Sequence, residues 1–181
     1  MFLEGLYLAS THKMVALLNP ADTLADSITV NLINPVTKLV DYSSKGVVSV
    51  FGNSNILFPQ PALGQNYYIA IKNRNSLEVW SSVIFGFNTP DTLYDFTIGA
   101  TKAYGSNQIL VEPGVYALHT GDLNQDGAIN FNDFNVENSS LSSGYYVGYY
   151  PGDINGDGII ESTDYSWIEN KTKTTFTKAN P

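Results

Sequence analysis

The chain of 181 residues contains no cysteine and only nine lysine and arginine residues. Without cysteine it has no disulfides, no zinc–thiolate site and no thiol catalysis. No run of about 18 apolar residues is present, so we expect no transmembrane helix and no membrane insertion. The first residues lack the basic region and cleavage site of a signal peptide, so we expect a mature protein or a piece of one. Something other than disulfides must stabilise the fold, and bound metal is one option.

Histidine is also scarce, and this bears on catalysis. His12 and His119 are the two histidines, and neither lies in a motif that supplies a nucleophile or a set of metal ligands. The sequence has no Gly-rich phosphate loop and no Gly-x-Ser-x-Gly turn. We therefore expect a protein that is not an enzyme.

Acidic residues, in contrast, are concentrated in one segment of a chain whose formal net charge is -8. Residues 121–170 contain no lysine or arginine. They carry nine carboxylates: Asp122, Asp126, Asp133, Glu137, Asp153, Asp157, Glu161, Asp164 and Glu169. Such a segment repels itself unless cations are bound, and it disfavours nucleic acid as a partner.

Residues 1–116 have the pattern of short strands separated by turns. Alternating or wholly apolar runs occur at 27–33, 45–51, 55–58, 67–72, 77–80, 94–98 and 108–111, with Asn-Pro, Gly-Asn and Pro-Gly turns between them. This spacing predicts a mostly β fold with an N-terminal β-sandwich, immunoglobulin-like or transthyretin-like. The composition changes near residue 117, so we expect a second unit over 117–181.

This second unit contains an internal repeat. The segment that starts at Asp122 reads Asp-Leu-Asn-Gln-Asp-Gly-Ala-Ile-Asn-Phe-Asn-Asp, and the one that starts at Asp153 reads Asp-Ile-Asn-Gly-Asp-Gly-Ile-Ile-Glu-Ser-Thr-Asp. The offset is 31 residues (153 minus 122), and the two segments align without a gap. A helix is expected after each segment, over 132–137 and 163–169.

The residue types in the repeat are those that calcium prefers. Calcium takes six to eight oxygen ligands, from side chains at loop positions 1, 3, 5, 9 and 12 and from the backbone carbonyl of position 7. Glycine at position 6 permits the sharp turn, and isoleucine at position 8 is expected to point inward. The predicted ligands of two ions are Asp122, Asn124, Asp126, Ala128, Asn130 and Asp133 in the first loop, and Asp153, Asn155, Asp157, Ile159, Glu161 and Asp164 in the second.

Two other interpretations of the loops are weaker. Asp-Gly and Asn-Gly are common in turns that bind no metal, but turn chemistry does not explain carboxylates concentrated twice without counter-charge. Magnesium prefers octahedral sites that keep several waters, and zinc needs the Cys or His ligands that the loops lack. Calcium therefore remains the expected cofactor.

The repeated Gly-Asp-x-Asn-x-Asp-Gly-x-Ile-x-x-x-Asp, each copy followed by a short helix, resembles the dockerin domain of bacterial secreted assemblies over roughly residues 119–173. The resemblance implies a calcium-dependent pair of loop-helix units that docks onto a cohesin partner. It also implies that loop positions 10 and 11 recognise the partner, here Phe131-Asn132 and Ser162-Thr163. Ser162-Thr163 fits one dockerin pattern, whereas Phe131 does not.

These observations predict a secreted or cell-surface protein, since extracellular calcium modules commonly bind at about 0.1–1 mM. One hypothesis is a structural subunit that self-associates into an extracellular fibre or layer. A second is a module that docks onto a cohesin-like receptor, and a third is a carbohydrate-binding module with exposed aromatic residues. Tyr145, Tyr146, Tyr149 and Tyr150 are candidates for such a surface, although packing against the neighbouring unit is the favoured interpretation.

Overall fold

The fold is known from a computed structural model, which describes residues 1–17, 23–89, 91–142 and 147–181. The strands are β1 Phe2–Leu3, β2 Tyr7–Leu8, β3 Lys13–Met14, β4 Leu24–Ile33, β5 Val40–Ser49, β6 Asn66–Asn73, β7 Ser76–Trp80, β8 Phe85–Gly86, β9 Ile109–Glu112, β10 Val115–Leu118, β11 Ala128–Ile129 and β12 Phe176–Thr177. The α-helices are α1 Phe131–Ser142 and α2 Ser162–Thr172. Strands predominate, so the expectation of a mostly β protein is confirmed.

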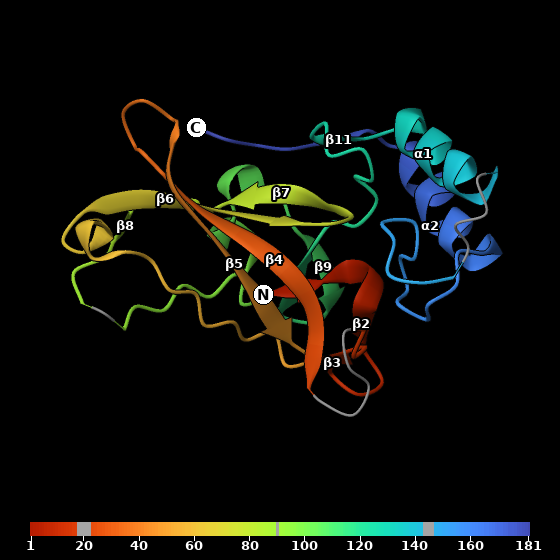
Figure 1. The fold of residues 1–181 in the computed structure, drawn as a ribbon, viewed down its shortest axis with the longest axis horizontal. Coiled ribbons are helices and arrows are strands. Elements are labelled where there is room, and N and C mark those ends of the chain that lie inside the picture. The colour runs from red at the N-terminus through yellow and green to blue at the C-terminus, as the bar shows by residue number, and fades with distance from the viewer. Residues whose placement is uncertain (18–22, 90, 143–146) are drawn as a thin grey trace.

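The main sheet has the strand order β5-β4-β6-β7, with β8 paired to β6. All of its pairings are antiparallel. A smaller sheet has the order β1-β10-β9, in which β1 runs parallel to β10. The hairpin β2-β3 continues from β1 along the chain (Figure 1).

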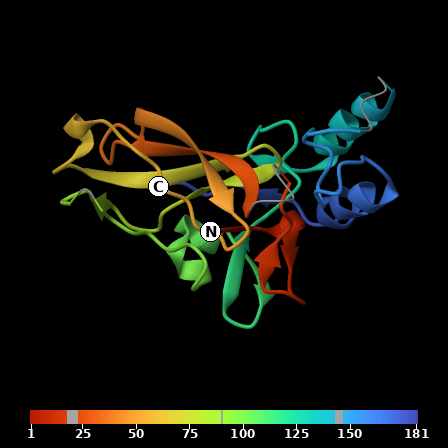
Figure 2. The same ribbon diagram turned by 60° about the horizontal axis from the view of Figure 1, so that its bottom comes forward.

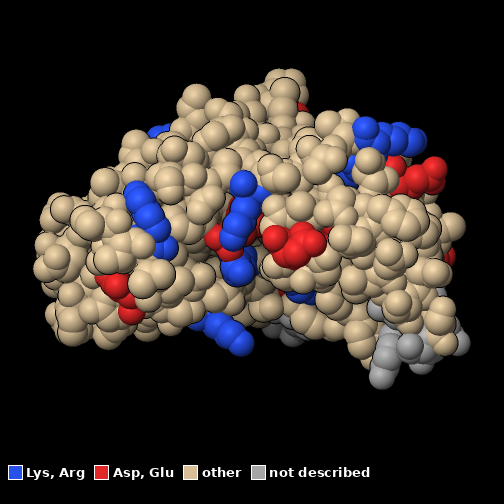
Figure 3. Space-filling model, turned by 90° about the horizontal axis from the view of Figure 1, so that it is seen from above, with Lys and Arg blue, Asp and Glu red and all other residues tan. Residues whose placement is uncertain are grey.

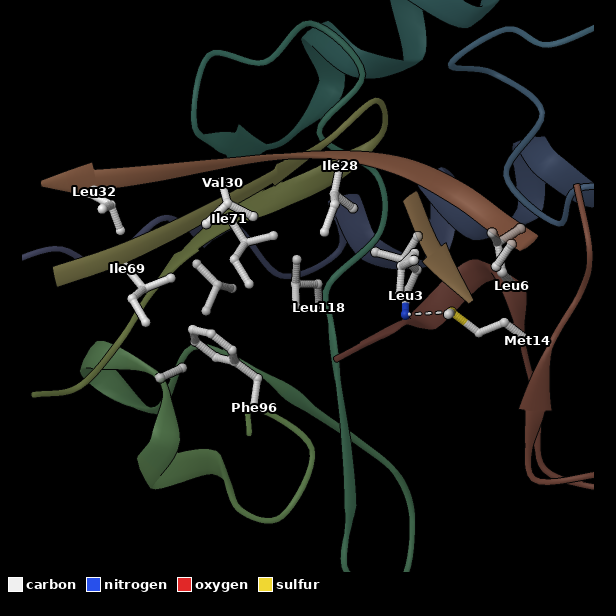
Figure 4. Packing of buried hydrophobic residues seen from close by; sticks show 14 of the residues in the cluster. Leu3, Leu6, Met14, Ile28, Val30, Leu32, Ile69, Ile71, Phe96 and Leu118 are labelled. Carbon is white, nitrogen blue, oxygen red and sulfur yellow. Dashed lines mark hydrogen bonds between the residues drawn. The ribbon is translucent and has the colours of Figure 1, made fainter. Parts of the chain in front are cut away.

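A single apolar cluster joins the two sheets. The strand β4 alternates, with Ile28, Val30 and Leu32 buried on the inner face, as expected for a strand with one side on a core. Leu118 of the smaller sheet packs in the same cluster, and so does Phe96, which comes from a segment without regular structure (Figure 4). The β-rich part of the chain therefore has its own hydrophobic core.

Two expected strands are absent, and each absence has a local cause. In the segment 94–98 the Asp95 carboxylate accepts hydrogen bonds from the backbone N–H and the hydroxyl of Thr97, at 2.8 and 2.7 Å, which turns the chain instead of extending it. The segment 55–58 follows β5 without joining its ladder, and it is followed by Pro59.

The expected boundary between units falls inside a strand. The strand β10 spans residues 115–118 and pairs with both β1 and β9, so the polypeptide crosses from one expected unit to the other within the smaller sheet.

The helices α1 and α2 lie side by side at one end of the molecule, in the views of Figures 1 and 2. The C-terminal segment then returns along the molecule, and β12 pairs with β11. Neither helix has the length and apolar character needed to cross a membrane, in the part of the chain that the structure describes.

Candidate metal site formed by two repeated loops

The two loops have the same backbone conformation at the points where the repeat predicts it. Gly127 and Gly158, at position 6, have φ angles of +87° and +86°, a region that side chains other than glycine rarely adopt. Ile129 and Ile160, at position 8, are buried, as predicted. The helices α1 and α2 both begin at position 10, which confirms the expectation that a helix follows each loop.

The last carboxylate of each loop closes it through backbone hydrogen bonds. In the first loop Asp133 Oδ1 accepts from Leu123 N at 2.8 Å and from Asn124 N at 3.2 Å, and Asp133 Oδ2 accepts from Asn130 N at 2.9 Å. In the second loop Asp164 accepts from the equivalent groups, those of Ile154 at 2.8 Å, Asn155 at 3.2 Å and Glu161 at 3.0 Å. Both aspartates are completely buried. The repeat in the sequence is therefore a repeat in geometry.

The side chains of positions 3 and 5 arrange the turn of each loop in the same way. Asn124 Oδ1 accepts from Asp126 N at 2.9 Å, and Asp126 Oδ1 accepts from Ala128 N at 2.9 Å. The second loop repeats both bonds with Asn155, Asp157 and Ile159, at the same distances. In these bonds one oxygen of each side chain accepts from the backbone two residues further on, as in an Asx-turn.

Burial raises the pKa of four aspartates in the loops. The pKa of Asp122 rises to about 6, first because of burial and then because of the nearby charges of Asp133 and Asp126. Burial also raises the pKa of Asp133, Asp153 and Asp164, against the opposing effect of their backbone hydrogen bonds. The folded loops thus hold negative charge where it is unfavourable, which a bound cation would offset.

One oxygen in the first loop is poorly paired. Asp122 Oδ1 is buried and forms no hydrogen bond of ordinary geometry with a described residue, although the backbone N–H of Gln125 interacts with this carboxylate and opposes the rise of its pKa, and Asp122 Oδ2 accepts from Gly127 N at 3.2 Å. Leaving a buried carboxylate oxygen unpaired is costly. In the second loop the equivalent Asp153 Oδ1 accepts from Gly156 N at 2.9 Å.

The predicted ligands fit a hard cation by their chemistry. Each loop offers carboxylate, amide and backbone carbonyl oxygens, the donor set of calcium rather than zinc. Among the described residues, no three His, Cys, Asp or Glu side chains converge into a compact metal-binding group. The side chains of Asn124 and Asp126 instead bond to each other, with Asn124 Nδ2 donating to Asp126 Oδ2 at 2.9 Å.

An arginine that the sequence interpretation missed connects the second loop to the main sheet. Arg74 lies in the turn between β6 and β7, and its Nε donates to the buried Asp26 carboxylate at 3.1 Å. The same guanidinium donates to the backbone carbonyl of Asp153, from Nη2 at 2.7 Å, and to that of Tyr150. The neighbouring Asn75 Nδ2 donates to Pro151 O at 3.2 Å. The entry to the second loop is therefore fixed on the β-rich part of the chain.

A second connection is buried between the N-terminal segment and α2. Lys171 Nζ donates to Glu4 Oε2 at 2.5 Å and to His119 Nδ1 at 3.0 Å. The same Glu4 oxygen accepts from Thr120 N at 2.9 Å. Burial lowers the pKa of His119 to about 3, with a further contribution from the charge of Lys171. None of these residues stands in a motif, so no signal in the sequence marks their pairing.

Two of the four candidate tyrosines can be placed, since Tyr145 and Tyr146 lie outside the described residues. The Tyr149 ring lies 5.0 Å from the Arg74 guanidinium carbon, and its hydroxyl hydrogen-bonds to Asp26 and Ser27. Tyr150 supplies a carbonyl to Arg74. Both residues join the second loop to the main sheet. This contact favours packing between the two parts as their role, rather than an exposed aromatic platform.

Charged side chains do not form a patch of one sign on the face seen in Figure 3, where basic and acidic side chains lie next to each other near the middle. Pairs of this kind include Lys72 with Glu78 at 3.1 Å and Lys178 with Glu78 at 3.9 Å.

Comparison of the chain with protein-family models, with curated proteins and with solved structures found no match. Its function must therefore be inferred from its own residues.

Proposed function

We propose that this chain is a non-catalytic, calcium-stabilised extracellular protein that acts as a structural subunit and self-associates into a fibre or layer. The proposal assigns a β-sandwich to the N-terminal part and a dockerin-like pair of calcium loops to the C-terminal part. The observation that carries it is the equivalence of the two loops, each closed by a fully buried aspartate at position 12.

A bound calcium ion would supply positive charge at each loop. The residues of this chain would hold it through the predicted side-chain and carbonyl oxygens, and Asp122 Oδ1 offers a buried and poorly paired oxygen. Two ions would bring a charge of +4 to a segment that carries nine carboxylates. Binding of calcium and folding of this segment are therefore expected to be coupled.

A structural role is favoured by how the loops are attached. Arg74 and the Glu4–Lys171 pair connect the C-terminal part to the main sheet and to the N-terminal segment, through side chains that are almost completely buried. Charged pairs that are buried and hydrogen-bonded fix geometry more than they add stability. A calcium-ordered part with a fixed orientation suits a subunit that must present the same surface in every copy.

Docking onto a cohesin-like receptor is the second candidate, and one observation favours it. The partner-recognition positions implied by the dockerin resemblance are exposed in both loops, at Phe131-Asn132 and at Ser162-Thr163. The Phe131 side chain is 65% exposed and stacks on Phe134 with ring centroids 5.5 Å apart. An exposed aromatic residue at the start of α1 is suited to a protein contact.

Particle size and thermal stability, measured in about 1–2 mM calcium and again with excess chelator, test the proposal. We expect chelation to lower the melting temperature and to convert large particles into monomers. If chelation lowers the melting temperature but the protein is monomeric under both conditions, self-association is rejected and receptor docking remains the candidate function. An unchanged melting temperature would contradict calcium binding.

A further inference from the structure

The strand β5 is an unpaired edge of the main sheet. It is ten residues long and pairs on one side with β4, and no described strand pairs with its other side. Exposed edge strands offer rows of backbone donors and acceptors to another chain, and proteins usually protect them.

Among the described residues, hydrogen bonds from the segment after β5 reach one end of the edge, and the Ile56 side chain of the same segment packs against Gly46 and the core. Ser49 N donates to Asn53 O at 2.8 Å, and the Ser54 hydroxyl donates to Val47 O at 2.9 Å. Because Asn53 and Ser54 do not belong to β4, these two bonds show that the backbone groups of Ser49 and Val47 face away from β4.

The middle of the edge remains open. Backbone groups alternate in direction along a strand, so the N–H and C=O of Lys45 and Ser43 face the same open side as those of Val47. No described residue outside the sheet forms a hydrogen bond with these groups. Both residues are exposed.

The charges of β5 are arranged symmetrically about Ser43. Its two charged residues are Asp41 and Lys45, each two positions from Ser43, and both are exposed. Lys45 forms no ion pair with any described residue, and Asp41 accepts only from the Asn34 amide, at 3.0 Å. Asp41 is the extra residue of a β-bulge, since Val40 pairs with Ile33 and Tyr42 with Leu32.

We propose that β5 pairs with β5 of a second copy of this chain, antiparallel and with Ser43 opposite Ser43. In this register Asp41 of each copy lies opposite Lys45 of the other, so two opposite-charge pairs form on one face. The open N–H and C=O groups of the two Ser43 residues pair with each other. The contact is isologous, so it gives a closed dimer, and a fibre or layer needs a second contact between dimers.

Exposed apolar residues at both ends of the edge agree with this register. Leu39 is 68% exposed and Val40 53% exposed at one end, and Val47 is 38% exposed at the other. Antiparallel pairing about Ser43 brings each end of one strand to the opposite end of its partner, so these apolar residues meet. Lys45 also gives specificity, because a foreign strand without an acid at the matching position leaves its charge unpaired.

Reversing the charges tests the pairing. Asp41→Lys places two lysines opposite each other across the dimer, and Lys45→Asp places two aspartates opposite each other. Each variant alone should weaken the dimer roughly tenfold, since two attractive pairs become repulsive. An equimolar mixture of the two variants should associate again, because every pair between unlike chains is then attractive. Asp91→Lys and Lys173→Asp make the same changes in net charge at exposed positions away from β5 and serve as matched controls.

Blocking the backbone groups gives a second test that leaves charge unchanged. Ser43→Pro removes an N–H that faces the open side, so the bonds to β4 are kept and the dimer should be lost. Circular dichroism and the melting temperature show whether this variant folds. The charge-reversal mixture tests the same register without proline.

Sedimentation of the full chain in calcium, from about 1 μM to about 1 mM, measures all of these variants. The inference rests on the proposed self-association. Weakened association of each single variant, recovery in the mixture and unchanged controls support it. A wild-type chain that stays monomeric overturns both the pairing and the self-association. A wild-type chain that assembles while the single variants behave identically overturns only the β5 pairing.

Discussion

The β-rich part and the C-terminal loops of this protein are held together by different interactions. Among the described residues, the main apolar cluster contains 17 buried residues, drawn from both sheets and from the segments between their strands. The cluster between the loops and helices contains three: Leu123, Ile154 and Ile168. In place of a large core, the loops have buried aspartates that accept backbone hydrogen bonds. The first part is stabilised by apolar burial, whereas the second holds buried carboxylates whose charge, on our proposal, bound calcium neutralises.

Removing the carboxylates that close the loops should give the largest effect. Asp133→Ala or Asp164→Ala removes three backbone hydrogen bonds and, on our proposal, a calcium ligand, so we expect a loss of about 3–5 kcal/mol in the free energy of unfolding. Denaturant melts in calcium measure it.

Leu32→Ala in the completely buried core of β4 is the matched control from the other region, with an expected loss of about 2–5 kcal/mol. The free energy of unfolding lost in Leu32→Ala should be the same with and without calcium. The loss in the two aspartate variants should become smaller when calcium is chelated. If each of the three variants lost the same free energy of unfolding with and without calcium, the two regions would not differ in their dependence on calcium.

Breaking the connection between the regions should have the next largest effect. Lys171→Met leaves the Glu4 carboxylate buried without its cation, so we expect a loss of about 3 kcal/mol in calcium, measured by denaturant melting. The double variant Glu4→Gln with Lys171→Met removes both charges and should recover much of the loss. A single variant as stable as the wild type would show that the pair does not join the regions.

Acid should destabilise the protein through His119, with the smallest effect. The folded pKa of His119 is lowered to about 3 from an ordinary value of 6.5, so the unfolded chain binds a proton first as the pH falls below 6.5. Stability is therefore lost on acidification, by about 1–2 kcal/mol between pH 6.5 and pH 5.

His119→Gln removes this titration and isolates its contribution from that of the loop carboxylates. Chemical denaturation between pH 5 and pH 7.5 gives the slope of the free energy of unfolding against pH for the wild type and for the variant. The variant should show a shallower loss toward low pH. Parallel curves would mean that His119 titrates in the folded protein as it does in the unfolded chain.

The sequence predicted the loops better than it predicted their surroundings, and the reason is physical. Each repeated loop is local, so Gly127 and Asp133 in the first loop determine its turn within 12 consecutive positions. The strand β4 was also predictable, because its alternation reflects one buried face, and β6 was predictable from its apolar run, which is buried on both faces.

Contacts between residues far apart in the chain leave no local pattern in the sequence from which they could be predicted. The pairing of Glu4 with Lys171 joins residues 167 positions apart, and that of Arg74 with Asp153 O joins residues 79 apart. The predicted strand over 94–98 failed for a different reason, because the Asp95 side chain competes with the ladder for backbone donors. Short-range competition of this kind cannot be separated from strand propensity by apolar pattern alone.

A calorimetric titration of the full chain with calcium tests whether the two loops bind this ion. We predict about two ions bound per chain, at about 0.1–1 mM affinity, and about one in Asp133→Ala and in Asp164→Ala. The double variant should bind none. A wild-type chain that binds no calcium, or one whose binding survives both substitutions, would contradict the account.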